Sequence, residues 1–222
     1  MKRIFNFFDC NTLYKRCIIA SIAHAIMVGE YDMLSAEQSW ENKNYNFQNM
    51  ENIRGVISFS HDYYVCVIQN NATFNNTIFN ADINSILSNF FQGADEETLQ
   101  LARTEALLYM LVEENGKISP FISAAFWGKG SQNFSNQNEE DIIAISENTL
   151  LPLMCYEEDA KKYWKDYYEM NKDQYKMMES LYNRRITTTG PIKLMPSEKE
   201  QLTEWFGNIN ECLESFAELN IL

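Results

Sequence analysis

The side chains that most often perform acid–base or nucleophilic chemistry are scarce in this chain. It contains two histidines, His24 and His61, and five cysteines that lie far apart in the sequence. Two histidines cannot form a histidine-rich metal cluster or an H-E-x-x-H zinc motif, and no cysteine lies at C-x-x-C or zinc-finger spacing. We therefore expect no metal site and no cofactor.

The two histidines differ in their surroundings. His24 falls within the apolar residues 12–29, which is typical of a histidine in a hydrophobic core. His61 precedes Asp62 in a polar break between two apolar segments, where a partner is expected to reach it. Catalysis by His61 as base and Cys66 as nucleophile is disfavoured, because Cys66 is expected to face the core from the middle of a strand.

Two other patterns resemble catalytic motifs but have simpler explanations. The run Gly128-Lys-Gly-Ser131 lacks the Walker spacing, in which four residues separate a first glycine from Gly-Lys-Ser/Thr, so we interpret it as a turn after a strand. Paired acids such as Glu96 and Glu97 stand at expected helix starts, where the helix dipole favours negative charge. A hydrolase needs two carboxylates that converge from separate elements, and sequence spacing leaves that alternative open.

The net charge narrows the class of partner. The chain of 222 residues has 31 acidic and 18 basic side chains, a formal net charge of −13. This balance argues against binding to nucleic-acid phosphates or to a membrane through a basic patch. Residues 1–54, 55–138 and 139–222 carry net charges of 0, −5 and −8. The C-terminal part, which includes the run Glu157-Glu158-Asp159, is therefore the segment expected to attract a basic protein.

Hydrophobic periodicity predicts a central helix and a β-hairpin. Residues 12–29 are apolar around most of a helix, which is typical of a helix packed on several sides. Residues 55–69 alternate on either side of the His61-Asp62 break. The expected cross-strand pairs are Phe59 with Tyr64, Ile57 with Cys66 and Gly55 with Ile68. The opposite face of this hairpin is half polar and is expected to meet solvent or a partner.

The remaining elements follow from period, caps and breakers. Residues 35–52 are expected to form a long connection with one short strand. Further strands are predicted at 72–79 and 118–127, and helices at 82–92, 96–113, 139–150, 157–183 and from a capping box at Ser197 onward. In the helix at 157–183, Tyr168 lies beside the aromatic stripe and is expected to reach the surface.

These elements predict an α+β fold. We expect an antiparallel sheet of about four strands between residues 40 and 130, with the N-terminal helix and the helices at 82–92 and 96–113 on one of its faces. A C-terminal helical hairpin follows. The polar loop at 128–138 divides an α+β portion, residues 1–130, from a helical portion, residues 139–222, and the two are expected to pack as one globular unit.

The expected compartment is the cytoplasm. The cysteines are odd in number and unpaired in pattern, as in proteins of reducing compartments. The apolar run that begins at Cys17 is only about a dozen residues long, too short to span a bilayer. Asp9 and His24 also argue against a secretory signal.

The segment from Leu34 to Phe59, with Ser39-Trp40-Glu41, Asn44-Tyr45-Asn46-Phe47 and Arg54-Gly55-Val56, resembles bacterial immunity proteins of polymorphic-toxin systems. The resemblance implies a small acidic cytoplasmic protein that binds and neutralises a basic toxin domain without catalysing a reaction. The implied partner contacts are Trp40 and Tyr45 in the loop, His61, Asp62 and Tyr63 at the hairpin tip, and Glu157, Glu158 and Asp159. The alternatives are a small hydrolase with a carboxylate or Cys/His site and a regulatory or scaffolding subunit.

Overall fold

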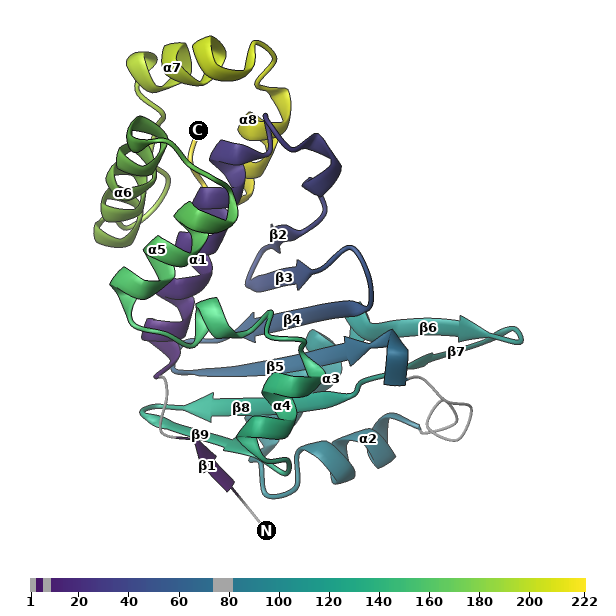
Figure 1. Ribbon diagram of the computed structural model, residues 1–222. Coiled ribbons are helices and arrows are strands. Elements are labelled where there is room, and N and C mark those ends of the chain that lie inside the picture. Colours follow the sequence, from purple (N-terminus) through teal and green to yellow (C-terminus); the bar gives the residue numbers. More distant parts are fainter. Residues whose placement is uncertain (1–2, 6–8, 74–81) are drawn as a thin grey trace.

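The computed structural model describes residues 3–5, 9–73 and 82–222, and these residues form an α+β fold (Figure 1). The strands are β1 (Arg3–Phe5), β2 (Gln38–Glu41), β3 (Asn44–Gln48), β4 (Ile53–Phe59), β5 (Tyr63–Asn70), β6 (Leu111–Glu114), β7 (Lys117–Pro120), β8 (Ala124–Lys129) and β9 (Gln132–Ser135). The α-helices are α1 (Cys10–Met27), α2 (Ile83–Phe90), α3 (Glu96–Thr104), α4 (Glu139–Ile145), α5 (Glu157–Tyr167), α6 (Lys172–Thr187), α7 (Pro196–Phe206) and α8 (Asn210–Glu218). Four short 3-10 helices are η1 (Asp32–Leu34), η2 (Asn71–Thr73), η3 (Ala106–Met110) and η4 (Leu151–Leu153).

Seven strands form one antiparallel sheet in the order β1-β9-β8-β5-β4-β3-β2, and β6 pairs with β7 in a separate two-stranded sheet. The expectation of an antiparallel sheet is confirmed, but four strands were too few. The strands that periodicity missed are short and polar. β2 and β3 lie within residues 35–52, where a long connection with one short strand was expected, and β9 lies inside the loop expected at 128–138.

The β4–β5 hairpin has the register that the sequence predicts. Phe59 pairs with Tyr64, Ile57 with Cys66 and Gly55 with Ile68. Gly55 also lies opposite Phe47 of β3, and a Cβ atom there would come within 2.1 Å of the Phe47 ring. The glycine is required because the phenyl ring occupies the space over its Cα atom.

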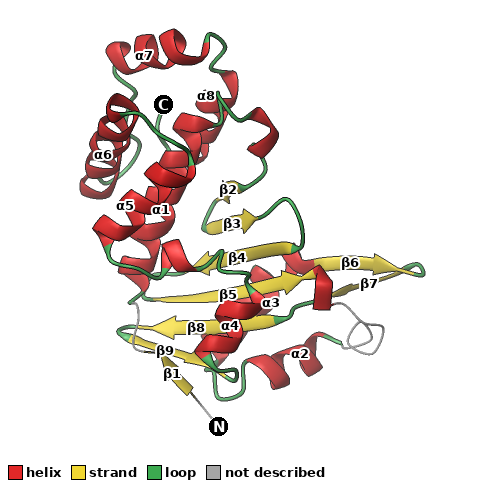
Figure 2. Ribbon diagram, viewed as in Figure 1, coloured by secondary structure: helices red, strands yellow, loops and turns green. Residues whose placement is uncertain are grey.

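Helices cover both faces of the large sheet (Figure 2). One face, with Ile57 and Cys66, packs in the same apolar cluster as α1. The other face, with Val56, Val65 and Val67, packs against α2, α3 and η3. The expectation that all three helices share one face is therefore wrong. Strand side chains alternate between the two faces of a sheet, and the second face of the hairpin also carries apolar side chains. These side chains are buried by helices of their own.

Helix α1 is buried along most of its length, as its sequence predicts. Asp9 caps its N-terminus by accepting a 2.8 Å hydrogen bond from the Thr12 amide. The helix contacts η4, α5, α6 and α8, and its apolar cluster includes side chains from residues 1–130 and from residues 139–222. Within the described ranges, no helix is both long and apolar enough to cross a membrane.

The C-terminal part is helical, but it forms more helices than one hairpin. The helix expected at 157–183 is divided into α5 and α6, and Glu169 in the break has a φ of 50°. The last helix is divided at Gly207, whose φ of 74° suits a glycine at a helix end. Ser197 is not the cap, because α7 begins at Pro196 and the Glu198 carboxylate accepts a hydrogen bond from the Met195 amide.

Three other expected elements have different bounds. The helix expected at 96–113 ends at Thr104 and continues as η3 and then β6. The strand expected at 118–127 is two strands, because β7 pairs with β6 while β8 joins the large sheet. Of the strand expected at 72–79, residues 72 and 73 belong to η2 and the rest lies outside the described residues.

Candidate functional site

The hairpin tip lies at the surface. His61 and Asp62 are exposed, and the Ser60 amide donates a 2.8 Å hydrogen bond to the Tyr63 carbonyl to close the turn. The Gly130 amide bonds the Asp62 carbonyl at 2.9 Å, so the β8–β9 turn supports the tip. Tyr63 is half-buried, and the Lys129 ammonium lies 5.5 Å from its ring centroid. His61 and Asp62 are therefore the accessible part of this segment.

Trp40 and Tyr45 do not lie in an exposed loop, which corrects the sequence expectation. They belong to β2 and β3 and are 9% and 1% exposed. The Trp40 indole donates a 2.8 Å hydrogen bond to the Ser21 hydroxyl, and the Tyr45 hydroxyl donates one of 2.9 Å to Oε1 of Gln38. Both rings pack in the core, so neither offers a surface contact.

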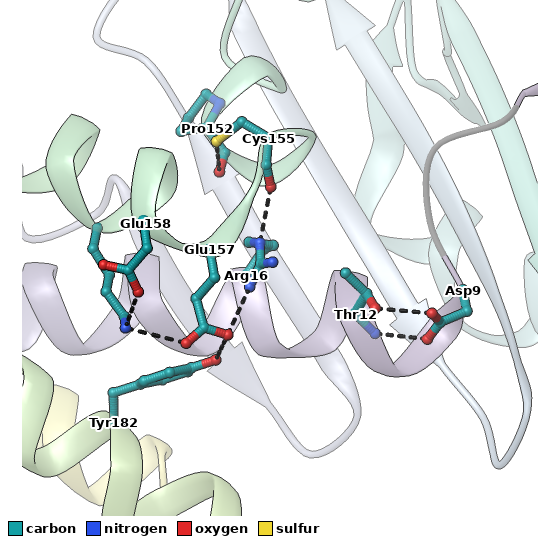
Figure 3. Close-up of polar contacts among 9 residues, drawn as sticks. Asp9, Thr12, Arg16, Pro152, Cys155, Glu157, Glu158 and Tyr182 are labelled. Carbon is teal, nitrogen blue, oxygen red and sulfur yellow. Dashed lines mark hydrogen bonds and ion pairs between the residues drawn. The ribbon is translucent and has the colours of Figure 1, made fainter.

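The acidic run at the start of α5 divides into Glu157, which bonds to α1 and α6 (Figure 3), and the exposed residues Glu158 and Asp159. Glu157 pairs with Arg16 at 3.3 Å and Lys161 at 3.1 Å, and accepts a 2.8 Å hydrogen bond from the Tyr182 hydroxyl. Burial raises the pKa of Glu157, but these partners outweigh it and the net pKa is lowered. Glu157 thus stabilises the packing of α1, α5 and α6.

Glu158 and Asp159 face outward instead. The Glu158 side chain is 76% exposed and pairs only with Lys161 among the described residues, at 2.8 Å; Asp159 is also exposed. The preceding residue, Tyr156, is 84% exposed. Sequence reasoning missed Tyr156, because its position directly before a helix start does not indicate whether its ring is exposed.

Helix α1 connects this acidic run with the hairpin tip. The Cys10 thiol donates to the Tyr63 carbonyl at 3.6 Å, and Nε of Arg16 donates to the Cys155 carbonyl at 2.9 Å. Arg16 lies six residues after Cys10 along the helix, a rise of about 9 Å. Both exposed segments therefore lie beside the N-terminal end of α1, on the left of the view in Figure 1. We name this surface the acidic end; its members are Asp9, His61, Asp62, Tyr156, Glu158 and Asp159.

A cavity of about 200 Å³ lies farther along α5, between that helix and the start of the β2–β3 hairpin. We name it the tyrosine pocket. Its walls combine aromatic rings with carboxylates and amides from β2, β3, α5 and the segment between α4 and η4. The lining residues used below are Glu37, Gln38, Glu147, Tyr163, Trp164 and Tyr167.

Glu37 is the polar centre of the tyrosine pocket. It is 8% exposed, and its carboxylate accepts hydrogen bonds from the hydroxyls of Tyr167 at 2.5 Å and Tyr168 at 3.3 Å. Burial raises the pKa of Glu37, and the two tyrosine hydrogen bonds oppose that rise. Among the described residues, no basic side chain pairs with this carboxylate.

A buried polar network lies behind Glu37. The Tyr168 hydroxyl is 3.1 Å from Nδ1 of His24 and accepts a 3.4 Å hydrogen bond from Nε2 of Gln38. Tyr168 is 1% exposed, so the expectation that it reaches the surface is wrong. The break after α5 turns its ring inward onto α1. His24 is 1% exposed, which confirms a core histidine, and burial lowers its pKa to about 4.

The cysteines are placed for packing. Cys17 and Cys66 are fully buried, and burial raises the pKa of each thiol well above its usual value. Cys66 therefore faces away from the exposed His61, as the sequence predicts. Within the part of the chain that the structure describes, no group of three or more His, Cys, Asp or Glu side chains could hold a metal ion.

Comparison of the chain with protein-family models, with curated proteins and with solved structures found no match.

Proposed function

We propose that this chain is a non-enzymatic binding protein that neutralises a basic toxin domain, as bacterial immunity proteins do. The observation that carries the proposal is the acidic end. It joins two exposed segments, Asp62 and Glu158-Asp159, that are almost a hundred residues apart in the sequence.

The charges at this end are arranged to act on a partner. Glu158 and Asp159 point outward, whereas the nearby bases Arg16 and Lys161 have side chains only 8% and 7% exposed. Lys162 on α5 is also exposed and Lys15 on α1 is half-buried, but the exposed carboxylates Asp9, Asp62, Glu158 and Asp159 outnumber these two bases. Outward charges of one sign raise association rates, and their effect weakens as salt shortens the Debye length below about 10 Å.

Tyr156 supplies an apolar contact within the acidic end. Tyrosine is enriched at protein interfaces because its ring buries a large area at low cost in conformational entropy. At 84% exposure, the ring of Tyr156 is available for burial by a partner. Tyrosine is one of the residues most often found as an interface hot spot once a partner buries its ring.

The test is co-expression with the product of the adjacent gene, followed by measurement of association rates at low and high salt. We expect a stoichiometric complex whose association slows at least tenfold between about 50 and 500 mM salt. At low salt, the variant Asp62→Lys/Glu158→Lys/Asp159→Lys should associate more slowly than the unmodified protein. The matched control, Glu200→Lys/Glu204→Lys/Glu211→Lys, makes the same change in net charge at exposed positions of α7 and α8 and should have a smaller effect.

Two outcomes would contradict the proposal. One is the absence of a complex with the products of the neighbouring genes. The other is an equal effect of the two triple variants, which would show that net charge acts without a defined surface. A scaffolding subunit would form the complex but would not restore growth to cells that express the partner, so a growth assay separates that alternative.

The hydrolase alternative has one observation in its favour. Glu37 and Glu147 line the same cavity from separate elements, which two-carboxylate chemistry requires. Turnover of chromogenic glycosides that is lost in both Glu37→Gln and Glu147→Gln would support it. Absence of turnover in the unmodified protein would count against it.

A further inference from the structure

We propose that the tyrosine pocket binds one organic cation, the guanidinium group of an arginine side chain that the basic partner inserts beside Glu37. The choice of the partner as the source rests on the proposed function. The affinity of the pocket for a guanidinium group is tested without that partner.

The first support is an unneutralised buried charge. Glu37 is more than nine-tenths buried at the cavity wall and has no ion pair among the described residues. A carboxylate offers about four acceptor sites, and the Tyr167 and Tyr168 hydroxyls use two of them. The remaining sites suit the planar donor fork of a guanidinium group.

The second support is the aromatic wall. Tyr163 and Tyr167 have ring centroids 6.0 Å apart and nearly parallel planes, at 10°. The Trp164 ring meets Tyr167 edge-on, at 5.5 Å and 84°. Faces of electron-rich rings next to a carboxylate attract cations, and arginine stacks on such rings more often than lysine does.

The third support is size. Pockets that enclose drug-sized ligands or cofactors usually measure about 300–1,000 Å³. The tyrosine pocket, at about 200 Å³, is smaller than that range and would hold roughly six or seven waters at about 30 Å³ each. The end of one side chain fits this volume better than a complete metabolite.

The fourth support is continuity with the acidic end. Tyr156, Asp159, Tyr163 and Tyr167 are spaced by three, four and four residues, so they follow one face of α5. Tyr163 and Tyr167 remain 41% and 45% exposed. The eleven residue steps from Tyr156 to Tyr167 span about 16 Å of helix. A partner of ordinary interface size that covers the acidic end can also reach the pocket.

The test uses two short probes that differ in charge alone. Acetyl-Gly-Arg-Gly-amide presents a guanidinium group, and the citrulline analogue presents a neutral urea group of the same shape. Binding is followed by NMR through the indole N–H signal of Trp164, which is identified among the four tryptophans by its loss in Trp164→Phe. We expect a saturable shift with the arginine peptide at millimolar concentration and at least tenfold weaker binding of the citrulline peptide.

Variants connect this binding to the pocket. Glu37→Gln keeps the shape of the side chain and should weaken the arginine peptide at least tenfold. Tyr163→Ala removes a half-exposed ring that makes none of the hydrogen bonds described for the chain, so it keeps the test decisive if Glu37→Gln is poorly folded. It should weaken binding severalfold. The control Glu200→Gln removes one charge from an exposed position on α7 and should leave binding unchanged.

Equal binding of the two peptides, or unchanged binding in Glu37→Gln and Tyr163→Ala, would overturn the inference. In the complex with the partner, Glu37→Gln should raise the dissociation rate at least tenfold, and an unchanged dissociation rate would refute the partner as the source of the cation. These outcomes are separate from the fate of the proposed function, because peptide binding needs no partner and the triple variant at the acidic end leaves the pocket intact.

Discussion

The Tyr167 hydroxyl donates a 2.5 Å hydrogen bond to Oε1 of Glu37, although 130 residues separate the two in the sequence. The bond joins the C-terminal end of α5 to the residue that directly precedes β2. It also helps to orient the Glu37 carboxylate at the tyrosine pocket, because the buried Tyr168 hydroxyl donates a hydrogen bond to the other carboxylate oxygen.

Loss of this bond should be measurable as loss of stability. We expect Tyr167→Phe to lower the free energy of unfolding by about 1.5–3 kcal/mol, the usual worth of a hydrogen bond to a charged group. Chemical denaturation at pH 7 measures the change. Tyr163→Phe is the matched control, since none of the hydrogen bonds described for the chain involves the Tyr163 hydroxyl. An equal effect of the two variants would contradict this role of Tyr167.

Glu37 should make the protein less stable as pH rises. Its folded pKa lies above its usual value of 4.5, so the folded state holds the proton more tightly than the unfolded state does. The contribution of Glu37 to stability is therefore fully present below pH 4.5 and is lost as pH rises through the folded pKa. Glu37→Gln removes this dependence, so the difference in stability between variant and parent should shift in favour of the variant from pH 4.5 to pH 8. A constant difference across that range would refute the prediction.

His24 should act in the opposite direction, at acidic pH. Burial lowers its pKa from 6.5 to about 4. Between pH 4 and pH 6.5, His24 is therefore protonated in the unfolded state but neutral in the folded state. Stability is full above pH 6.5 and falls by about 3 kcal/mol as pH drops to 4, at 1.36 kcal/mol per pKa unit. In His24→Gln the loss between pH 7 and pH 4 should be smaller by about that amount. Urea denaturation at both pH values gives the comparison, and an unchanged loss would exclude His24 as its origin.

The Arg16–Glu157 pair should matter more than a surface pair. The Arg16 side chain is 8% exposed, and it bonds the Cys155 carbonyl as well as Glu157. Arg16→Met should destabilise the fold by about 2–4 kcal/mol, because Glu157 loses a partner within the α1–α5 packing. Lys176→Met breaks an exposed pair with Asp173, and it should cost at most about 0.5 kcal/mol. Thermal unfolding measures the destabilisation of each variant, and a similar loss of stability in both would contradict the prediction.

Gly55→Ala should be strongly destabilising for a steric reason. The added methyl group would lie 2.1 Å from Cζ of Phe47, so the phenyl ring or the strand must move. We expect a cost of about 2–3 kcal/mol, at the upper end of the usual effect of overpacking. In a Phe47→Ala background the space is free, so the same substitution should cost much less. A double-mutant cycle measures this coupling, and additive effects would disprove the clash.

Local periodicity was sufficient to predict some elements from the sequence. The hairpin register follows from alternation on both sides of a two-residue tip, because a shift of one residue would turn every apolar side chain to the wrong face. The central position of α1 follows from its uniform apolarity. The helix breaks at Glu169 and Gly207 were not predicted, since apolar spacing continues across them and tertiary packing overrides local propensity.

Which residues lie at the surface could not be predicted, because it depends on contacts between segments far apart in the sequence. Asn-rich and aromatic residues near Trp40 resembled a loop, but pairing of β3 with β4 makes them strands and buries Trp40 and Tyr45. The sequence by itself determined the acidic balance, the hairpin and the central helix, because composition and short-range period express them directly. Only the tertiary structure decided that Asp62 and Asp159 share one end and that Glu37 meets Tyr167 beside a cavity. Such meetings depend on which faces of distant elements pack together, and that is a property of the whole chain.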